Sequence, residues 1–183
     1  TMVWRFSNHA GTHVDAPKHF SSPGKSISDY DATFWIFNRV EVVDISEKVA
    51  DCQLIGPESL PSFNSEEPEL LLIKTGYGKY RGTDRYTLTP PGISEEVAHW
   101  LRNHYPSVRC VGVDLISISS FNNRNAGRKA HKAFLAPDRG EPVSLIEDMN
   151  MNIDCVFTQV IVAPLLVVNA DGSPCTVLGV VSD

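Results

Sequence analysis

Eleven residues near the start of the sequence, from His9 to His19, constrain the folded chain more than any other stretch. They contain three imidazoles and one carboxylate, at positions His9, His13, Asp15 and His19. All four positions are odd, so an extended chain would turn their side chains to one face, because strand residues alternate with a period of two. A helix would point Asp15 away from His13, and Pro17 would interrupt its hydrogen bonds. We therefore expect an extended segment.

A straight strand cannot gather these four side chains around one point, so the segment is expected to bend. Four residues of strand rise separate His9 from His13 by roughly 13 Å, whereas each ligand atom of a metal ion lies about 2 Å from it. Gly11 tolerates the backbone angles of a bend, and the Thr12 hydroxyl can hold a tight turn. An isolated His–Asp pair is most often a solvated turn, but four such groups around one bend predict a metal or acid–base site.

Length and composition limit the class of protein. The 183 residues, 42% of them hydrophobic and 21% charged, predict one globular domain over 1–183 with a substantial core. The formal net charge of −6, without a basic stripe, disfavours a nucleic-acid partner. No apolar run approaches the roughly 20 residues that cross a bilayer and no secretion signal is visible, so we expect a cytoplasmic protein without a membrane partner. The four cysteines lack the C-x-x-C spacing of a zinc knuckle or a dithiol.

The hydrophobic pattern along the chain predicts the α/β class. Runs of aliphatic or β-branched residues with strand length occur at 40–45, 70–74, 108–113, 143–146, 156–162 and 177–181. Ser94 followed by two glutamates is typical of a helix start, and residues 124–135 predict a second helix that ends before Pro137. The chain begins directly before an alternating, strand-like stretch from Val3 to Phe6, so we expect that a segment preceding Thr1 is missing.

The histidine-rich segment can be written His9-x-Gly11-Thr12-His13-x-Asp15-x-Pro17-x-His19. In this form it resembles the signature of the metal-dependent cyclase-like hydrolases, a family that includes bacterial kynurenine formamidase and isatin hydrolase. Other segments follow in the order that the family shows, at 73–77, 111–114, 130–131, 145–149 and 171–175. The resemblance implies a single domain with the family's swivelling β/β/α arrangement, a mixed sheet and few helices. It also implies a homo-oligomer, either a dimer or a tetramer.

The resemblance further implies roles for individual residues. The positions that match the ligands of a first divalent ion are His9, His13 and Asp15, and those that match a second are Asp15, His131 and Glu147. Asp15 would then bridge the two ions, and His19 matches the family's catalytic acid–base group. Without the resemblance, a helical His131 between lysines and a Glu147 at a strand end are typical of surface groups. The roles of these two residues therefore depend on the resemblance.

This donor set predicts a particular chemistry. Imidazoles and carboxylates without thiolates suit Zn²⁺ or Mn²⁺, as one ion or two. Such an ion lowers the pKa of its water toward neutrality, and the hydroxide attacks an amide or formyl carbonyl that the ion polarises. His19, with an ordinary pKa of about 6.5, would take a proton from the water and return it to the leaving amine. We expect an arylformamidase-like hydrolase of a small aromatic amide, by analogy with kynurenine formamidase and tryptophan catabolism.

Several alternatives remain open at the level of sequence. An isatin-like cyclic amide or a lactone would use the same groups, and a polyketide-type cyclase or dehydratase would form product without adding water. A non-catalytic module that binds a metal or a ligand would have no use for His19. Aromatic residues near the segment either line a substrate pocket or belong to the core, namely Trp4, Phe6, Phe20, Phe34 and Trp35. Residues at the start of the second helix either orient an anionic substrate group or form a surface cluster, namely Arg124, Asn125 and Arg128.

Overall fold

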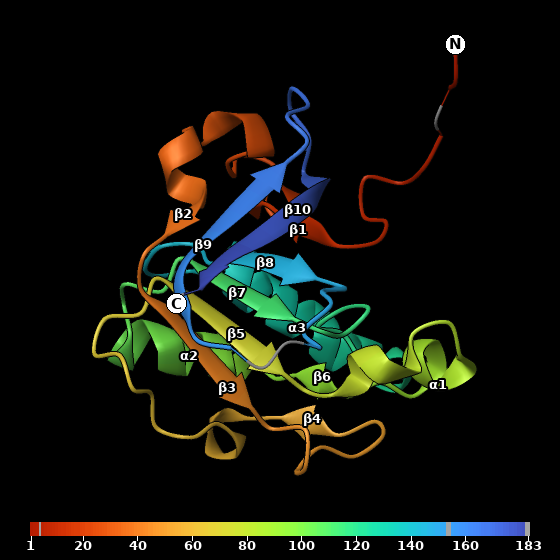
Figure 1. Cartoon of the computed structure of the whole chain (residues 1–183), viewed down its shortest axis with the longest axis vertical. Coiled ribbons are helices and arrows are strands. Elements are labelled where there is room, and N and C mark those ends of the chain that lie inside the picture. Colours follow the sequence, from red (N-terminus) through yellow and green to blue (C-terminus); the bar gives the residue numbers. More distant parts are fainter. Residues whose placement is uncertain (4, 153–154, 182–183) are drawn as a thin grey trace.

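A mixed β-sheet of eight strands lies at the centre of the molecule (Figure 1), in the order β2-β9-β10-β1-β8-β7-β5-β3. The computed structural model describes residues 1–3, 5–152 and 155–181. Four neighbouring strands are parallel, namely β3 (Val40–Asp44), β5 (Leu70–Lys74), β7 (Cys110–Val113) and β8 (Ser144–Glu147). The other four pair antiparallel, namely β1 (His13–Asp15), β10 (Gly172–Val181), β9 (Phe157–Pro164) and β2 (Ile36–Phe37). All six predicted strands are confirmed: the bounds of β5 are those predicted, and the ends of the others are shifted by at most five residues.

The inner parallel strands β5 and β7 are buried and almost entirely apolar, because both faces of this part of the sheet are covered. Within β5, Leu71 and Ile73 belong to one core cluster, which includes the buried side chains of α2 and α3. Leu70 and Leu72 belong to a second cluster on the other face, together with residues of β9. Successive residues of a strand point to opposite faces, so this one run contributes to both cores.

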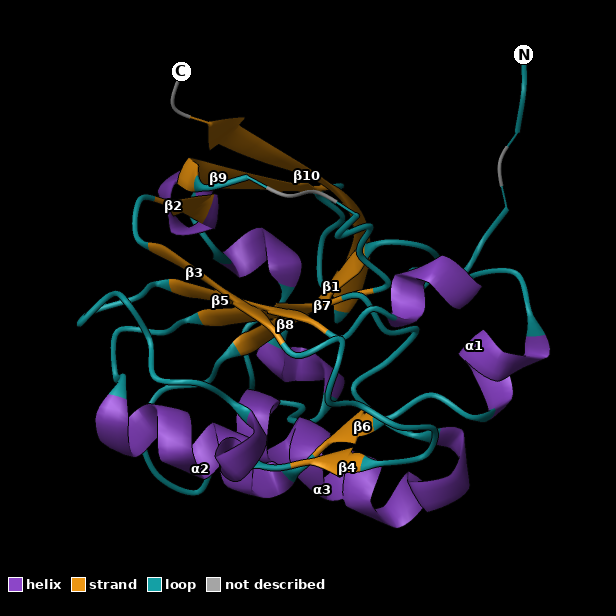
Figure 2. Cartoon of the chain, turned by 60° about the horizontal axis from the view of Figure 1, so that its bottom comes forward, coloured by secondary structure: helices purple, strands orange, loops and turns teal. Residues whose placement is uncertain are grey.

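Two helices cover one face of the parallel strands (Figure 2). They are α2 (Glu95–His104) and α3 (Arg124–Leu135), and the predicted bounds of α3 are those of the structure. Asn123 caps α3, because its side chain accepts a hydrogen bond from the Ala126 amide at 3.3 Å. The predicted α/β class with a mixed sheet and few helices is therefore confirmed.

The remaining elements are short. They are α1 (Asp84–Leu88), the two-stranded sheet of β4 (Leu54–Ile55) with β6 (Gly92–Ile93), and 3₁₀ turns at Pro17–His19, Ile27–Asp29, Ala32–Trp35, Pro57–Ser59, Tyr77–Tyr80 and Phe121–Asn123. The described part of the chain contains no helix with the length and apolar character that crossing a bilayer requires.

The strand-like interpretation of the first residues is wrong for those that the structure describes. Residues 1–3 and 5–7 form no strand, and the side chains of Val3 and Phe6 are exposed. Figure 1 shows this segment extending away from the sheet. Alternation alone cannot fix a strand that finds no pairing partner. Trp4 lies outside the described residues.

Strand β1 joins the two halves of the sheet and carries two of the predicted site residues. It pairs antiparallel with β8 on one side and with β10 on the other. Val14, its middle residue, points into the second core cluster. His13 and Asp15 therefore face the opposite side of the sheet, where α3 lies.

Candidate active site

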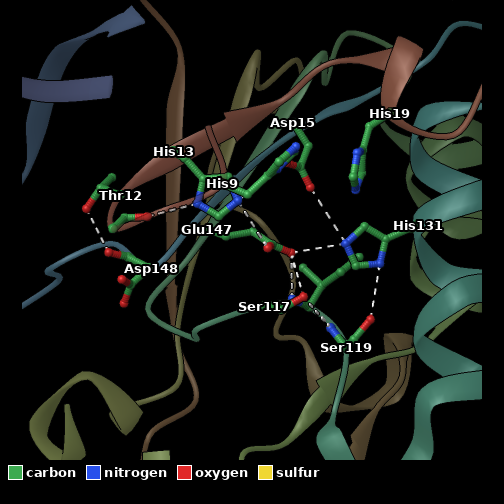
Figure 3. A network of polar contacts seen from close by, with 12 residues as sticks. His9, Thr12, His13, Asp15, His19, Ser117, Ser119, His131, Glu147 and Asp148 are labelled. Atoms are coloured by element: carbon green, nitrogen blue, oxygen red, sulfur yellow. Dashed lines mark hydrogen bonds and ion pairs between the residues drawn. The ribbon is translucent and has the colours of Figure 1, made fainter. Parts of the chain in front are cut away.

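Three elements bring four of the predicted residues together (Figure 3). The pairing of β1 with β8 sets Glu147 directly opposite His13. The His13 Nε2 atom lies 3.4 Å from Asp15 Oδ1 and 3.6 Å from Glu147 Oε2. From α3, His131 places its Nε2 atom 3.2 Å from Glu147 Oε1 and 3.7 Å from Asp15 Oδ2. All four side chains are buried, so they lie in a medium where charge interactions are strong.

The bend before β1 turns His9 back toward the same centre. Gly11 has a φ of +65°, in the left-handed region that favours glycine. The Thr12 hydroxyl donates a hydrogen bond of 2.7 Å to the Asp148 carbonyl, which fixes the bend against the end of β8. As a result, His9 Nδ1 lies 2.7 Å from Asp15 Oδ1. Gly11 thus has the backbone conformation expected of the bend, whereas the Thr12 hydroxyl holds the bend through a distant carbonyl and not within the turn.

His19 lies in the 3₁₀ turn that begins at Pro17, rather than in an extended segment. Its ring centroid is 4.3 Å from that of His9. His19 Nδ1 donates a hydrogen bond of 2.9 Å to Asp171 Oδ2, and the Asn8 side chain donates one of 2.7 Å to Asp171 Oδ1. Asp171 therefore fixes the His19 ring from outside the cluster, which leaves the second ring nitrogen available to the site.

The potential ligand atoms fall into two groups that share Asp15. The atoms of His9, Asp15 and His19 lie within 4.8 Å of one another, and so do those of His13, Asp15 and Glu147. Asp15 is the residue that the resemblance assigns as a bridge between two ions. The geometry also brings His19 within reach of a cation held by His9 and Asp15, so a ligand role competes with an acid–base role for this residue.

Two features of the donor set fit a divalent cation. The Nε2 atom of His9 is buried and makes no hydrogen bond with a described residue; the Asp171 Oδ1 atom lies 3.5 Å away, so this nitrogen is open to a ligand. His13 and His131 each donate Nδ1–H to a backbone carbonyl, of Gly11 at 2.8 Å and of Gly127 at 2.9 Å. Such bonds fix the tautomer in which Nε2 carries the lone pair, as in most metal-binding histidines.

The imidazoles and carboxylates of the site shift one another's pKa values. Burial opposes protonation of His13, but the Asp15 and Glu147 carboxylates outweigh it and raise the pKa of His13 to about 9. Burial likewise opposes ionisation of Asp15, yet hydrogen bonds from His13 and His9 lower its pKa below the ordinary value. With no metal bound, the imidazoles thus supply the positive charge that the two carboxylates require.

Residues for which the sequence predicts no role in the site hold the Glu147 and His131 side chains. The Ser117 hydroxyl donates to Glu147 Oε1 at 3.0 Å, and the Ile118 amide donates to the same oxygen at 2.7 Å. Ser119 Oγ lies 3.2 Å from His131 Nδ1. The sequence around these serines contains no motif of a serine nucleophile. Asp171 lies in the segment 171–175 that resembles the family, but the resemblance assigns it no role. The Asp-Gly pair at the start of β10 is the signal that could have pointed to Asp171.

The six predicted residues line one cavity of about 470 Å³. The cavity is completed by Phe20, Ile116, Ser117, Ser119 and Arg128. Of the aromatic residues near the segment, Phe20 alone among those described lines this cavity. Trp35 is buried in the second core cluster and Phe34 packs against it, because the turn at Ala32–Trp35 lies against β2 and β9. The core alternative is therefore the correct one for these two residues.

Fold and site together define a class of protein, in which a central sheet strand carries a histidine and an aspartate into a cluster of buried imidazoles and carboxylates. Residues 2–120 match the model of the Cyclase family, described as "Putative cyclase". Kynurenine formamidase of Bacillus cereus (strain ATCC 10987 / NRS 248) is 30% identical over 172 residues, which cover 92% of this chain and 74% of that protein. The chain therefore belongs to the cyclase family, as the resemblance predicted.

Solved structures share the same fold. Isatin hydrolase A from Labrenzia aggregata bound to benzyl benzoate superposes with a TM-score of 0.76 at 22% identity, over 96% of this chain and 76% of that chain. A structure titled "predicted metal-dependent hydrolase from Bacillus stearothermophilus" has a TM-score of 0.71 at 22% identity, over 94% of this chain and 77% of that chain. The arrangement of the mixed sheet is thus common to this chain and to these proteins.

Proposed function

We propose that the protein is a divalent-metal-dependent hydrolase of amide-type carbon–nitrogen bonds, acting on a small aromatic formamide. The observation that carries the proposal is the convergence of β1, β8 and α3 on one cavity, where buried imidazoles surround Asp15 and Glu147. The name of the Bacillus cereus relative supports the type of bond. Assembly as a homodimer or tetramer and a place in tryptophan catabolism stay predictions from the resemblance.

The residues that would hold the metal are the five of the predicted ligand set, namely His9, His13, Asp15, His131 and Glu147. Their oxygen and nitrogen donors suit Zn²⁺ or Mn²⁺ equally. A divalent ion bound there would polarise the substrate carbonyl and acidify water. The chain contributes by holding the donors in place, through Ser117 and Ile118 on Glu147 and through backbone carbonyls on two histidines.

His19 is assigned to proton transfer. Since its Nδ1–H donates to Asp171, its Nε2 carries the lone pair and can accept a proton from the attacking water as the new C–O bond forms at the formyl carbon. The same nitrogen then donates that proton to the anilide nitrogen as the C–N bond breaks. One formamide and one water thus yield formic acid and an aromatic amine. The Asp171 carboxylate stabilises the imidazolium between these two steps.

The proposal is tested by combining a turnover assay with metal analysis on the same samples. Wild-type protein loaded with Zn²⁺ or Mn²⁺ should hydrolyse a formanilide, and the same panel should include isatin and an aromatic lactone. His19→Ala should lower kcat by roughly a hundredfold to ten-thousandfold, as expected for loss of a general acid–base, while retaining the metal. His13→Ala should lose both metal and turnover. Equal activity in the wild type and both variants would exclude this site.

If His19→Ala also loses the metal, His19 is a ligand rather than the proton-transfer group. If metal-loaded wild type releases an amine from no member of the panel, the hydrolase assignment fails even where metal binding stands.

A further inference from the structure

One arginine lines the cavity and has no partner in the part of the chain that the structure describes. Arg128 lies on α3, and its guanidinium has no hydrogen bond, ion pair or ring contact with any described residue. Arg124, one turn earlier on the same helix, lies over the Phe121 ring at 4.5 Å instead and does not line the cavity. Arg128 is thus a charge placed at the site and unused by the fold.

The position of Arg128 follows from the helix. Residues three apart lie on the same helix face, so Arg128 sits beside His131. The helix approaches the site closely because residue 127 is glycine, where an added Cβ would lie 2.1 Å from Ser119 Oγ. The close approach that brings His131 to the carboxylates therefore brings the guanidinium to the rim of the same cavity.

The carboxylates of the site do not need this cation. Asp15 is already paired with His9 and His13, at 2.7 Å and 3.4 Å. Glu147 is paired with His131 at 3.2 Å and accepts two further hydrogen bonds from the Ser117–Ile118 segment. An anion that pairs with Arg128 must therefore come from outside the chain, since the acidic groups around it have their own donors.

Apolar surface lies in the same cavity. Phe20 is 36% exposed and Ile116 is 37% exposed, and both line the cavity. The Phe20 ring stacks on His131, with centroids 5.1 Å apart and planes 15° apart. Its orientation is thus fixed, and its exposed atoms offer a flat surface to an aromatic ring.

We propose that Arg128 is a specificity-determining residue that binds a carboxylate on the substrate, while Phe20 and Ile116 contact the substrate's aromatic ring. This inference rests on the proposed hydrolase function and assigns the residue that would select aromatic formamides with an acidic substituent. Arginine suits this role because its planar fork can donate two parallel hydrogen bonds to one carboxylate.

The test compares substrates that differ only in the carboxylate. Formanilide and the 2-, 3- and 4-formamidobenzoates are assayed with metal-loaded protein, and the measured quantity is the ratio of kcat/KM for the best formamidobenzoate to that for formanilide. Arg128→Gln should lower this ratio roughly tenfold to a hundredfold, the range for losing a charge-assisted hydrogen bond, mainly through KM. Arg128→Lys should recover part of the ratio, because it keeps the charge and loses the fork.

Arg124→Gln is the matched control, since it removes the same charge from the same helix away from the cavity, and it should leave the ratio at the wild-type value. An Arg128→Gln ratio equal to that of the wild type for all three isomers would overturn the inference while leaving the hydrolase assignment intact. An equal fall of the ratio in Arg128→Gln and Arg124→Gln would also overturn it. The loss of one positive charge from the helix would then explain the preference without any contact between Arg128 and the substrate.

Binding provides a readout that does not depend on turnover. Calorimetric titration with the three aminobenzoates should show that Arg128→Gln binds the tightest isomer roughly tenfold or more weakly than the wild type, with aniline as the uncharged reference. If the wild type hydrolyses no formamide, the hydrolase assignment fails, and this titration alone decides whether Arg128 recognises a carboxylate. Equal affinity in the two proteins would then reject that role.

Discussion

Two glycines determine how closely the site residues can approach one another. At Gly172, an added Cβ would lie 2.3 Å from Cε1 of His9, and at Gly127 it would lie 2.1 Å from the Ser119 hydroxyl. Both distances are far below van der Waals contact, so the His9 ring and the Ser119 loop occupy space that any larger residue would fill. The arrangement of the potential metal ligands thus depends on two glycines that supply no ligand atom themselves.

Gly172→Ala should displace His9 and weaken metal binding roughly tenfold to a hundredfold, the range seen when groups that orient a ligand are lost. The measurement is a competitive titration with a chromophoric chelator. Gly78→Ala serves as the control, because a Cβ there would meet Asp114 at an ordinary 3.6 Å. Unchanged affinity in Gly172→Ala would show that His9 is not held by this contact.

In the proposed mechanism, Asp171 would act on proton transfer through its hydrogen bond with His19, as a positioning residue. Asp171→Asn keeps the size of the side chain but removes the charge that stabilises the imidazolium, so kcat should fall roughly tenfold or more with KM little changed. Metal content should stay at the wild-type level. Asp138→Asn, on an exposed side chain of the Pro137–Pro142 loop, is the control. If Asp171→Asn keeps the wild-type kcat, the hydrogen bond between His19 and Asp171 does not contribute to catalysis.

Among the secondary-structure elements, helix α3 contributes both to the hydrophobic core and to the candidate site. Phe134 is fully buried against the sheet, and His131 extends from the same helix toward β1 and β8. Phe134→Ala should therefore cost about 3–5 kcal/mol in the free energy of unfolding, through lost burial and a cavity. Lys129→Ala, on the exposed side of the helix, should stay within about 0.5 kcal/mol. Urea titration of both variants checks the difference, and similar losses would contradict the packing described for α3.

The elements that the sequence predicts are those with a strong local pattern. A buried strand such as β5 gives a run of aliphatic residues, and the helix at 124–135 has an apolar stripe and is followed by Pro137, so the sequence predicts these elements with few errors. Two-residue strands such as β2, β4 and β6 are too short to show any period, and α1 has only five residues. Their existence depends on pairing with distant residues, which no local window contains.

The site residues also fall into those that a local sequence pattern predicts and those that it does not. The segment from His9 to His19 shows its chemistry locally, because its donors are concentrated around one bend. His131 and Glu147 look like surface groups in isolation, and they are buried only because α3 packs over the Ser117–Ser119 segment and β8 pairs with β1. Family resemblance located these two residues, since it records contacts that are distant in sequence.

At the scale of the whole molecule, ion pairs at the sheet ends make stability depend on pH. Burial disfavours the Asp44 carboxylate, but hydrogen bonds from Lys74 and Ser46 outweigh this and lower its pKa from 3.8 to about 2. Glu69 also has a lowered pKa, because the Asn38 amide and Arg109 outweigh its burial. A folded-state pKa below the unfolded value stabilises the fold above the unfolded pKa. That stabilisation is lost as pH falls through the folded pKa.

Acid titration of stability tests this reasoning away from the active site. For Asp44 the window runs from about pH 4 down to about pH 2. Asp44→Asn should therefore flatten the decline of the unfolding free energy between these values, measured by urea titration at several pH values. Its difference from the wild type should be constant above pH 5. A decline identical to that of the wild type would show that this pair does not contribute.

The central claim is that the buried imidazoles and carboxylates around Asp15 bind a divalent cation. The most direct measurement is calorimetric titration of metal-free protein with Zn²⁺ and Mn²⁺, in the wild type and in Asp15→Asn. We expect tight binding of one or two equivalents by the wild type, with release of protons from the histidines, and binding weakened at least tenfold in the variant. Absence of binding in the wild type, or equal affinity in the two proteins, would contradict it.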